Sequence, residues 1–204
     1  MYIPEQFAEK DFEKITGLVK NNPFGMLISE HNGSPCIVHL PFLFEPNVGS
    51  HGKLVGHMAK DNPQWKSLIE DKSVVVVFNG AHGYISPTLY STPGVPTWNY
   101  AVAHLHGKPT VIEDPAGIEN ILEKLTTCFE SNLPNPWKFS FPVNKSKLLQ
   151  MIVGFEINIQ KIEGKFKLSQ NKTPQERQNI INELSESSSS DDLELSKFMA
   201  SYFG

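Results

Sequence analysis

The residues from Thr97 to Gly107 combine aromatic, amide and imidazole side chains in one short segment, Thr-Trp-Asn-Tyr-Ala-Val-Ala-His-Leu-His-Gly. β-Branched and aromatic residues are frequent here and proline is absent, which predicts a β-strand. Alternation along a strand places Trp98 and Tyr100 with the two histidines on one face, and Asn99 with small apolar residues on the other. Such a strand packs into a core on one side and lines a site for a flat polar ligand on the other.

The two histidines of this strand, His104 and His106, are spaced so that both could reach one metal ion. No carboxylate lies near them in the sequence to complete a set of two histidines and one carboxylate. No Ser or Cys lies in a recognisable nucleophile turn, so a nucleophile–His pair has no better support. We therefore expect structural histidines and no metal site.

The segment from Gly56 to Trp65 offers a second kind of chemistry, anion binding. It reads as the end of a strand that runs into a short helix, with Pro63 in the first turn of the helix. Helix N-termini present unpaired N–H groups and a positive dipole end to phosphates. The polar side chains that could add donors there are His57, Lys60, Asn62 and Gln64. An ordinary capped helix with a solvated lysine explains the same residues, and the two interpretations stand side by side.

A further aromatic segment, from Tyr84 to Tyr90, lies in a predicted loop from Asn79 to Pro96. Flat ligands require aromatic faces for stacking together with a few hydrogen-bonding groups, and this segment supplies both through Tyr84 and Ser86. Core packing is the alternative for any single aromatic residue. Because the aromatic residues are clustered, they favour a ligand site.

Composition excludes several classes of protein. The chain has 204 residues, a formal net charge of -4 and a pI near 6.0, without a Lys/Arg run, which argues against a large nucleic-acid surface. It has no GxGxxG, GxxxxGK[ST] or GxSxG motif. No signal-peptide pattern and no apolar stretch of about 20 residues occurs. The two cysteines are isolated, as is typical of a reducing compartment. We expect a cytoplasmic protein without membrane contact.

The elements that position these residues are mostly strands. Strands are expected at residues 24–30, 36–44, 53–58, 74–78, 97–112, 152–162 and 165–169, with helices after Asp11, at Pro63, after Asp114 and in the tail. Asn32-Gly33 predicts a hairpin turn, and Pro41 must lie at an edge, a bulge or a strand end. The order predicts a mainly β protein with inserted helices (α+β), a small antiparallel barrel rather than a doubly wound sheet.

The last part of the chain differs in composition from the rest. Thr173 to Glu176 is a capping box that opens a helix, and Ser187 to Ser190 is expected to be a flexible linker before a final helix. The sequence therefore predicts one domain at residues 1–171 and a helical tail at residues 172–204.

Several sequence blocks resemble one known family, the PaiB-type FMN-binding proteins, also called negative transcriptional regulators, of the flavin-binding split-barrel superfamily. The blocks occur in order from residue 1 to about 171, and it is their combination that is specific. They are Met1-Tyr2-Ile3-Pro4, His39-Leu40-Pro41-Phe42, Gly56-His57-Met58-Ala59, Asn62-Pro63-Gln64-Trp65, Tyr84-Ile85-Ser86-Pro87, Val95-Pro96-Thr97-Trp98-Asn99-Tyr100, Val153-Gly154-Phe155-Glu156-Ile157 and Gly164-Lys165-Phe166-Lys167-Leu168-Ser169-Gln170-Asn171.

This resemblance implies an FMN-binding split β-barrel that forms a homodimer, with one FMN per subunit in a cleft between the two chains. It implies that the isoalloxazine ring lies against the strand at His39, that the phosphate lies near Lys60, and that the last strand closes the site. The implied cofactor-binding residues are His39, Leu40, Pro41, His57, Lys60, Asn62, Gln64, Tyr84, Ser86, Trp98, Asn99, Tyr100, Lys167, Ser169 and Gln170. Related oxidases bind the phosphate with an Arg/Lys pair, whereas Lys60 is the one cation in that segment of this chain.

The resemblance favours an FMN-binding protein of the PaiB type that is linked to transcriptional regulation. An FMN-dependent oxidoreductase acting on a small substrate is the first alternative, with Lys167 as a cation that could stabilise reduced flavin. A haem-handling split-barrel protein is the second, because a fold does not fix a function. No helix-turn-helix or basic stripe is evident, so direct DNA binding is not expected. The residues leave enzymatic activity open.

Overall fold

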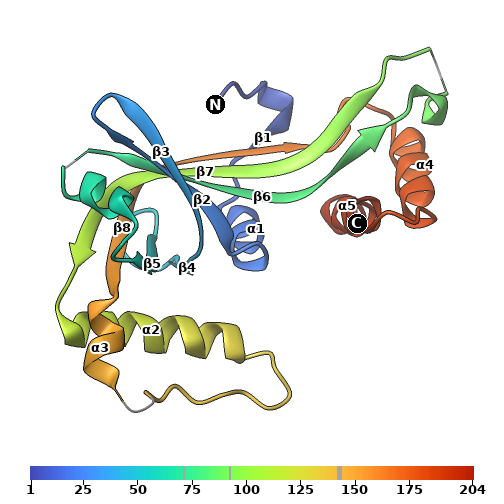
Figure 1. The fold of residues 1–204 in the computed structure, drawn as a ribbon. Coiled ribbons are helices and arrows are strands. Elements are labelled where there is room, and N and C mark those ends of the chain that lie inside the picture. The colour runs from blue at the N-terminus through green and yellow to red at the C-terminus, as the bar shows by residue number, and fades with distance from the viewer. Residues whose placement is uncertain (71, 92, 142–143) are drawn as a thin grey trace. The chain divides into compact units, whose positions relative to one another are not determined.

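The computed structural model describes residues 1–70, 72–91, 93–141 and 144–204 (Figure 1). Within them the strands are β1 (Ala8–Glu9), β2 (Phe24–His31), β3 (Ser34–Pro41), β4 (Leu43–Glu45), β5 (Lys53–Ala59), β6 (Val74–Ile85), β7 (Thr97–Ile112) and β8 (Ile152–Lys167). The α-helices are α1 (Phe12–Asn21), α2 (Pro115–Glu130), α3 (Lys145–Gln150), α4 (Pro174–Ser185) and α5 (Ser190–Phe203). Three short 3-10 helices are η1 (Glu5–Phe7), η2 (Pro63–Ile69) and η3 (Pro87–Leu89). The fold is therefore mixed α+β with inserted helices, as the sequence predicts.

Among the described residues, eight strands form one sheet in the order β3-β2-β6-β7-β8-β5-β4, and β1 pairs with β8. The chain divides by its contacts into two compact units. Unit 1 contains residues 1–21, 79–103 and 163–204, and unit 2 contains residues 22–78 and 104–162. The strands β6, β7 and β8 contribute residues to both units. In this division the tail belongs to the same unit as α1, and the domain boundary expected after residue 171 stays a prediction.

In unit 2, β2 and β3 form the predicted hairpin. Asn32 and Gly33 both have positive φ, 51° and 76°, which matches the turn that joins two-residue hairpins. The strands pair antiparallel from Phe24 opposite Pro41 to His31 opposite Ser34. Pro41 ends β3, and β3 ends the strand order of the sheet, so the missing N–H costs no ladder hydrogen bond. The predicted strand at 36–44 is divided here into β3 and β4.

The core of unit 2 lies on both sides of β5. The Phe42 ring meets Phe78 and Phe155 edge-on, with centroids 5.7 Å and 6.1 Å apart. On the other side, Ile121 of α2 packs on Val55, and both side chains are buried. The helix α2 begins where Pro and Asp predicted it, since the Asp114 side chain accepts a hydrogen bond from the backbone of the first turn.

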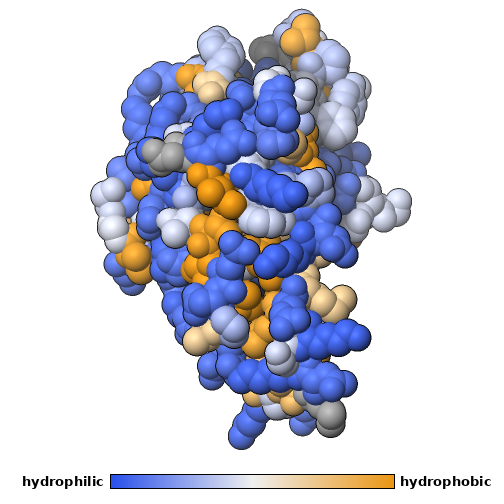
Figure 2. All heavy atoms as spheres, turned by 60° about the vertical axis from the view of Figure 1, so that its left-hand side comes forward, coloured by the Kyte–Doolittle hydropathy of each residue, from blue (hydrophilic) through white to orange (hydrophobic). Residues whose placement is uncertain are grey.

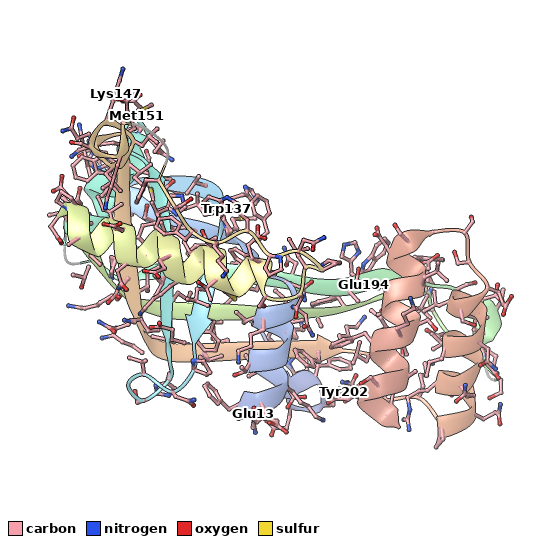
Figure 3. The ribbon with its side chains drawn as sticks, turned by 90° about the horizontal axis from the view of Figure 1, so that it is seen from below. Glu13, Trp137, Lys147, Met151, Glu194 and Tyr202 are labelled. Carbon is pink, nitrogen blue, oxygen red and sulfur yellow. The ribbon has the colours of Figure 1, made fainter. Side chains whose placement is uncertain are left out.

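In unit 1, the tail helices supply much of the core. Leu195 and Met199 of α5 are fully buried, and Phe198 packs against Phe166 of β8 with ring centroids 5.5 Å apart. The Lys14 ammonium of α1 lies 4.2 Å from the centroid of the Tyr202 ring of α5, which Figure 3 labels beside α1. The tail is therefore packed against the strands of its own unit.

The Ser-rich segment expected to be a linker connects α4 with α5, and its serines form hydrogen bonds there. Ser189 caps the N-terminus of α5 by accepting a hydrogen bond from the Asp192 backbone. The Ser187 hydroxyl donates to the Asp192 carboxylate at 2.7 Å. These serines terminate one helix and begin the next, which is the role that short hydroxyl side chains have at N-caps. The capping box of Thr173 and Glu176 is present as predicted.

Two strands are longer than the sequence predicts. The predicted loop from residue 79 is wrong up to Ile85, because β6 continues with Ala81, Gly83 and Ile85 facing inward in alternation. The predicted division into strands at 152–162 and 165–169 is also wrong, because β8 runs through Gly164 and pairs with β1. A Cβ atom at Gly164 would lie 2.9 Å from the Glu9 carbonyl oxygen, so this glycine permits close strand approach rather than a turn. No helix in the described residues is long and apolar enough to span a membrane.

Candidate functional site

The first residues of β7 separate the predicted ligand residues onto two faces. Trp98 is 50% exposed, whereas Asn99 is fully buried. Tyr100 is half-buried and Ala101 is buried. The alternation that the sequence predicts is confirmed, and it directs Trp98 and Asn99 to opposite sides of the strand.

The exposed side forms an aromatic groove within unit 1, with a volume of about 380 Å³. It is lined by Asn79, Gly80, His82, Trp98, Tyr100, Ala101 and Val102. The Trp98 ring centroid lies 6.1 Å from that of His82 and 6.3 Å from that of Tyr84. The groove thus presents aromatic faces together with imidazole and phenol groups, which suits a planar ring that needs stacking and in-plane hydrogen bonds.

The buried side of β7 holds a hydrogen-bonded pair. The Asn99 amide nitrogen lies 3.0 Å from the Ser169 hydroxyl, which in turn lies 3.1 Å from the Asn99 amide oxygen. The same amide nitrogen lies 3.6 Å from the sulfur of Met199. Both polar side chains are almost fully buried, so their hydrogen-bonding groups are satisfied within the fold.

Two more predicted residues at the end of β8 also bond to the backbone. The Lys167 ammonium donates to the Trp98 carbonyl oxygen at 2.8 Å and to the Thr97 hydroxyl. Burial and the neighbouring Lys165 lower the pKa of Lys167. The Gln170 side chain folds back on its own strand end, where it accepts from the Leu168 N–H at 2.7 Å. Ser86 likewise caps η3 by accepting from the Thr88 N–H.

In unit 2, two of the predicted phosphate ligands have structural partners. The buried Gln64 amide donates to the carbonyl oxygens of Leu27 and Cys36 at 3.2 Å and 3.0 Å, and to the Ser29 hydroxyl at 3.1 Å. Asn62 caps η2 by accepting from the Gln64 N–H at 3.0 Å. These contacts are what the alternative interpretation, an ordinary capped helix, requires.

The other two predicted phosphate ligands are more available. The Lys60 ammonium lies 3.1 Å from the Glu113 carboxylate, and both side chains are close to half-exposed, so this ion pair is weak. Burial lowers the pKa of His57 below its usual 6.5. Its Nδ1 atom is buried and has no hydrogen-bond partner among the described residues. The Lys60 ammonium is thus available to an anion, and His57 holds a buried ring nitrogen that the described residues leave without a hydrogen bond.

Lys60 also borders a pocket of about 390 Å³ in unit 2. The lining residues are Lys60, Glu113, Pro115, Ile118, Lys145, Ser146, Leu149, Gln150 and Ile152. Figure 2, seen from the side of α3, shows hydrophobic side chains open to the surface between hydrophilic ones. An apolar floor with lysines at the rim can accept a ligand that has a ring and an anionic group. Lys145, which the sequence interpretation missed, lies far along the chain from Lys60 and carries no local motif.

The strand implied for the isoalloxazine, β3, lies at one end of the strand order. His39 is exposed and its ring stacks on Phe24 of β2 with centroids 6.0 Å apart. Leu40 and Pro41 are half-buried. Further along β7, the His104 and His106 rings lie 6.5 Å apart and are both half-buried. The structure therefore gathers the predicted residues into separate groups within each unit.

Comparison with known proteins gives a family and a fold. Residues 1–161 match the family described as "Putative FMN-binding domain". "Protease synthase and sporulation protein PAI 2" of Bacillus subtilis (strain 168) is 36% identical over 189 residues, which cover 90% of this chain and 89% of the relative.

Solved structures of flavoproteins share the architecture. The flavocytochrome Anf3 from Azotobacter vinelandii superposes with a TM-score of 0.62 at 17% identity, over 78% of this chain and 69% of the other. The "FAD and Heme binding protein" from Mycobacterium smegmatis superposes with a TM-score of 0.61 at 19% identity, over 78% of this chain and 73% of the other. The split-barrel fold that the sequence resemblance implies is confirmed.

Proposed function

This chain belongs to the FMN-binding domain family together with the PaiB-type proteins, and from this premise we propose that its aromatic groove holds the isoalloxazine ring of FMN. The observation that carries the proposal is the half-exposed indole of Trp98 with His82 and Tyr84 beside it. A tryptophan face left open to solvent in a groove is an unusual use of so large an apolar surface, and a planar ring would cover it.

We propose separately that Lys60 and His57, both in unit 2, form an anion site that takes a phosphate group. The fit rests on the buried Nδ1 atom of His57, which lacks a partner among the described residues, and on the exposed, weakly paired ammonium of Lys60. A phosphate supplies acceptors to both groups, and its charge exceeds that of the Glu113 carboxylate that Lys60 now meets. Asn62 and Gln64 are left out of the assignment because their side chains support η2.

FMN itself would supply the redox chemistry when it is bound. The residues of the groove would bind and orient the ring, with Trp98 covering one of its faces. Aromatic stacking faces are what the groove supplies, so flavin binding is the function that its geometry favours.

The proposal includes a homodimer with FMN at the interface. It is supported by the family resemblance and by large apolar side chains that remain uncovered in the single chain, of which Tyr84 is 52% and Trp98 50% exposed. Exposed aromatic residues of this size are typical of protein interfaces. Light scattering on the purified protein should give twice the chain mass of 22.9 kDa, whereas a monomer that retains FMN would contradict the dimeric site.

The regulatory role is proposed to act without direct DNA contact. The net charge of -4 is unfavourable for binding a polyanion, because non-specific affinity for DNA comes mainly from phosphate contacts with Lys and Arg. A mobility-shift assay at physiological salt should show no specific complex. Specific binding to an operator by the purified protein would overturn the indirect route.

The flavin assignment is tested first by the absorbance spectrum of the purified protein and by mass spectrometry of the released ligand. Trp98→Ala should weaken FMN binding by about tenfold or more, because an aromatic stacking face is lost. Trp137→Ala is the matched control, since Trp137 is 53% exposed and lies in a loop of unit 2. Equal FMN content in both variants would show that the isoalloxazine ring does not bind in the groove.

The phosphate assignment is tested separately with two flavins. Lys60→Met should reduce affinity for FMN but leave affinity for riboflavin, which has no phosphate, unchanged. Lys66→Met is the control, because Lys66 is an exposed lysine on η2. An equal loss of both flavins in Lys60→Met would show that Lys60 acts on the fold and not on the phosphate.

A further inference from the structure

We propose that a small cavity in unit 1, separate from the aromatic groove, binds a small oxyanion through Lys167 and Lys172. The cavity, here called the lysine cavity, has a volume of about 130 Å³. It is lined by Phe7, Tyr90, Val95, Thr97, Asn99, Lys167, Ser169, Asn171 and Lys172. The proposal goes beyond FMN binding, since it concerns a second ligand of different size and chemistry.

The volume sets the size of the ligand. Drug-sized ligands occupy pockets of roughly 300–1,000 Å³, and a water molecule takes about 30 Å³ in the liquid. The lysine cavity is therefore too small for an isoalloxazine ring and large enough for a carboxylate or phosphate group with a few further atoms. Asn99 and Ser169 form its buried wall, on the opposite side of β7 from Trp98.

The charge of the lining sets the sign of the ligand. Two lysines line the cavity, and no acidic side chain does so among the described residues. Within the part of the chain that the structure describes, neither ammonium forms an ion pair: Lys167 donates to neutral oxygens, and Lys172 lies over the Tyr90 ring, 3.6 Å from its centroid. Two partly buried cations without a counter-charge cost desolvation energy that a bound anion would offset.

Donors remain available to the anion after the internal hydrogen bonds are counted. An ammonium has three N–H donors, and Lys167 uses two of them on Trp98 and Thr97. The Thr97 hydroxyl accepts from Lys167 and so keeps its own hydrogen for a ligand. Lys172 adds a second positive charge. Its backbone N–H donates to the Ser169 carbonyl oxygen at 2.9 Å, which closes the turn that follows Ser169.

The backbone at Ser169 supports the assignment. Ser169 has a φ of 64°, one of three positive values for residues other than glycine among the described positions. The other two, Asn32 and Asn144, are asparagines, which tolerate this conformation better. Strained residues of this kind concentrate at ligand sites. Here the strain brings the chain around so that Lys167 and Lys172 line the same cavity.

The experiment measures anion binding by calorimetry on the protein as purified, with its flavin. Sodium phosphate and sodium acetate are the probes, and sodium chloride is the control for ionic strength. Saturable binding of one phosphate or one acetate per chain above the chloride background is expected. Binding of phosphate alone would mean that the site takes a phosphate group, and binding of acetate alone that it takes a carboxylate. Binding of both probes would mean a general oxyanion site. No saturable binding of either probe overturns the proposal.

Three lysine variants locate the site. Lys167→Met and Lys172→Met should each weaken binding by about tenfold, since each removes a charged hydrogen bond. Lys165→Met is the control, because Lys165 lies two residues away on β8 with its ammonium at Tyr2 and over Tyr100, outside the cavity. Equal weakening in the control would mean general charge attraction and would overturn the proposal.

Circular dichroism and flavin absorbance are recorded for each variant. If Lys167→Met fails to fold, Lys172→Met carries the test, because the Lys172 ammonium lies over the Tyr90 ring and forms no hydrogen bond or ion pair with the described residues. Loss of anion binding in Lys172→Met with flavin content unchanged supports a separate site. Loss of flavin together with the anion would assign the cavity to the flavin site and overturn the proposal.

Discussion

The Asn99 amide and the Ser169 hydroxyl, seventy residues apart in the sequence, lie 3.0 Å from each other in the interior of unit 1. This pair connects β7 with the end of β8, and it turns Asn99 away from Trp98. Trp98 and Asn99 are neighbours in the sequence, and the resemblance to flavin-binding proteins names both. The alternation of the strand directs Trp98 to the groove and Asn99 to the buried side.

Asn99→Ala should therefore reduce the free energy of unfolding by about 1–3 kcal/mol, because a buried hydroxyl and a packing contact lose their partner. Chemical denaturation checks this value. Ser169→Ala and the double variant complete a cycle, and the two single losses should not add, since they remove the same interaction. If Asn99→Ala kept its stability but lost FMN, the amide would belong to the cofactor site instead.

The comparison of sequence and structure is most instructive at β6. The apolar run from Val74 to Phe78 predicts a strand. The polar residues Asn79, His82 and Tyr84 that follow predict a loop instead of a longer strand. Their side chains are exposed, and the burial pattern shifts by one residue at Asn79 and Gly80, so that Ala81 and Ile85 are buried at odd positions where Val74 to Phe78 are buried at even ones. Small and polar residues score poorly as strand formers, yet pairing in the sheet holds them there. Tyr84 is consequently part of a rigid strand beside Trp98 and not part of a loop.

The candidate site was predictable by residue type but not by partner. The buried role of Gln64 depends on Leu27, Ser29 and Cys36 of another hairpin, and no local pattern announces such contacts. Lys172 is not among the predicted site residues for the same reason, because its partner Tyr90 is distant in the chain. Local motifs identified the Asn32-Gly33 turn, the helix caps and most strands, though not the full length of β6 and β8. Tertiary contacts decided which polar side chains stay free.

The Glu176 carboxylate should make stability depend on pH. The Thr173 N–H, above all, and the N–H and hydroxyl of Ser91 lower the pKa of Glu176 from 4.5 to about 2. A carboxyl whose pKa is lower in the folded state than in the unfolded state stabilises the fold at any pH above the unfolded-state pKa. For Glu176 this contribution is lost as the pH falls from 4.5 towards 2. Thermal unfolding of the wild type across this range should show the loss.

Glu176→Gln should lower the melting temperature at neutral pH and flatten the acid part of the profile. An amide can still accept, but its NH₂ group would face N–H donors on one side. Glu183→Gln is the control, because Glu183 is exposed on the same helix. A profile for Glu176→Gln that parallels the wild type down to pH 2 would mean that other carboxylates govern acid unfolding.

Deleting residues 172–204 should destabilise unit 1 and cause loss of soluble protein, because the fully buried Leu195 and Met199 leave the core with it. Expression yield and thermal unfolding measure the effect. Met199→Ala isolates one contact and should cost about 2–5 kcal/mol, the usual range for a buried methionine. Glu194→Ala is the control, since Glu194 is exposed on α5 (Figure 3). A truncated protein that melts like the full chain would make the tail an appendage after all.

Gln64→Ala should weaken unit 2, because one buried amide serves three acceptors that belong to β2 and β3. Its loss removes a donor from the Leu27 and Cys36 carbonyl oxygens, whereas Ser29 keeps Ser67 as a partner, and should cost about 1–3 kcal/mol. Gln150→Ala, an exposed glutamine of the same unit, should change little. Affinities for FMN and riboflavin separate this role from phosphate binding: a structural glutamine affects both flavins equally, whereas a phosphate ligand affects FMN alone. A loss confined to FMN at unchanged stability would return Gln64 to the phosphate site.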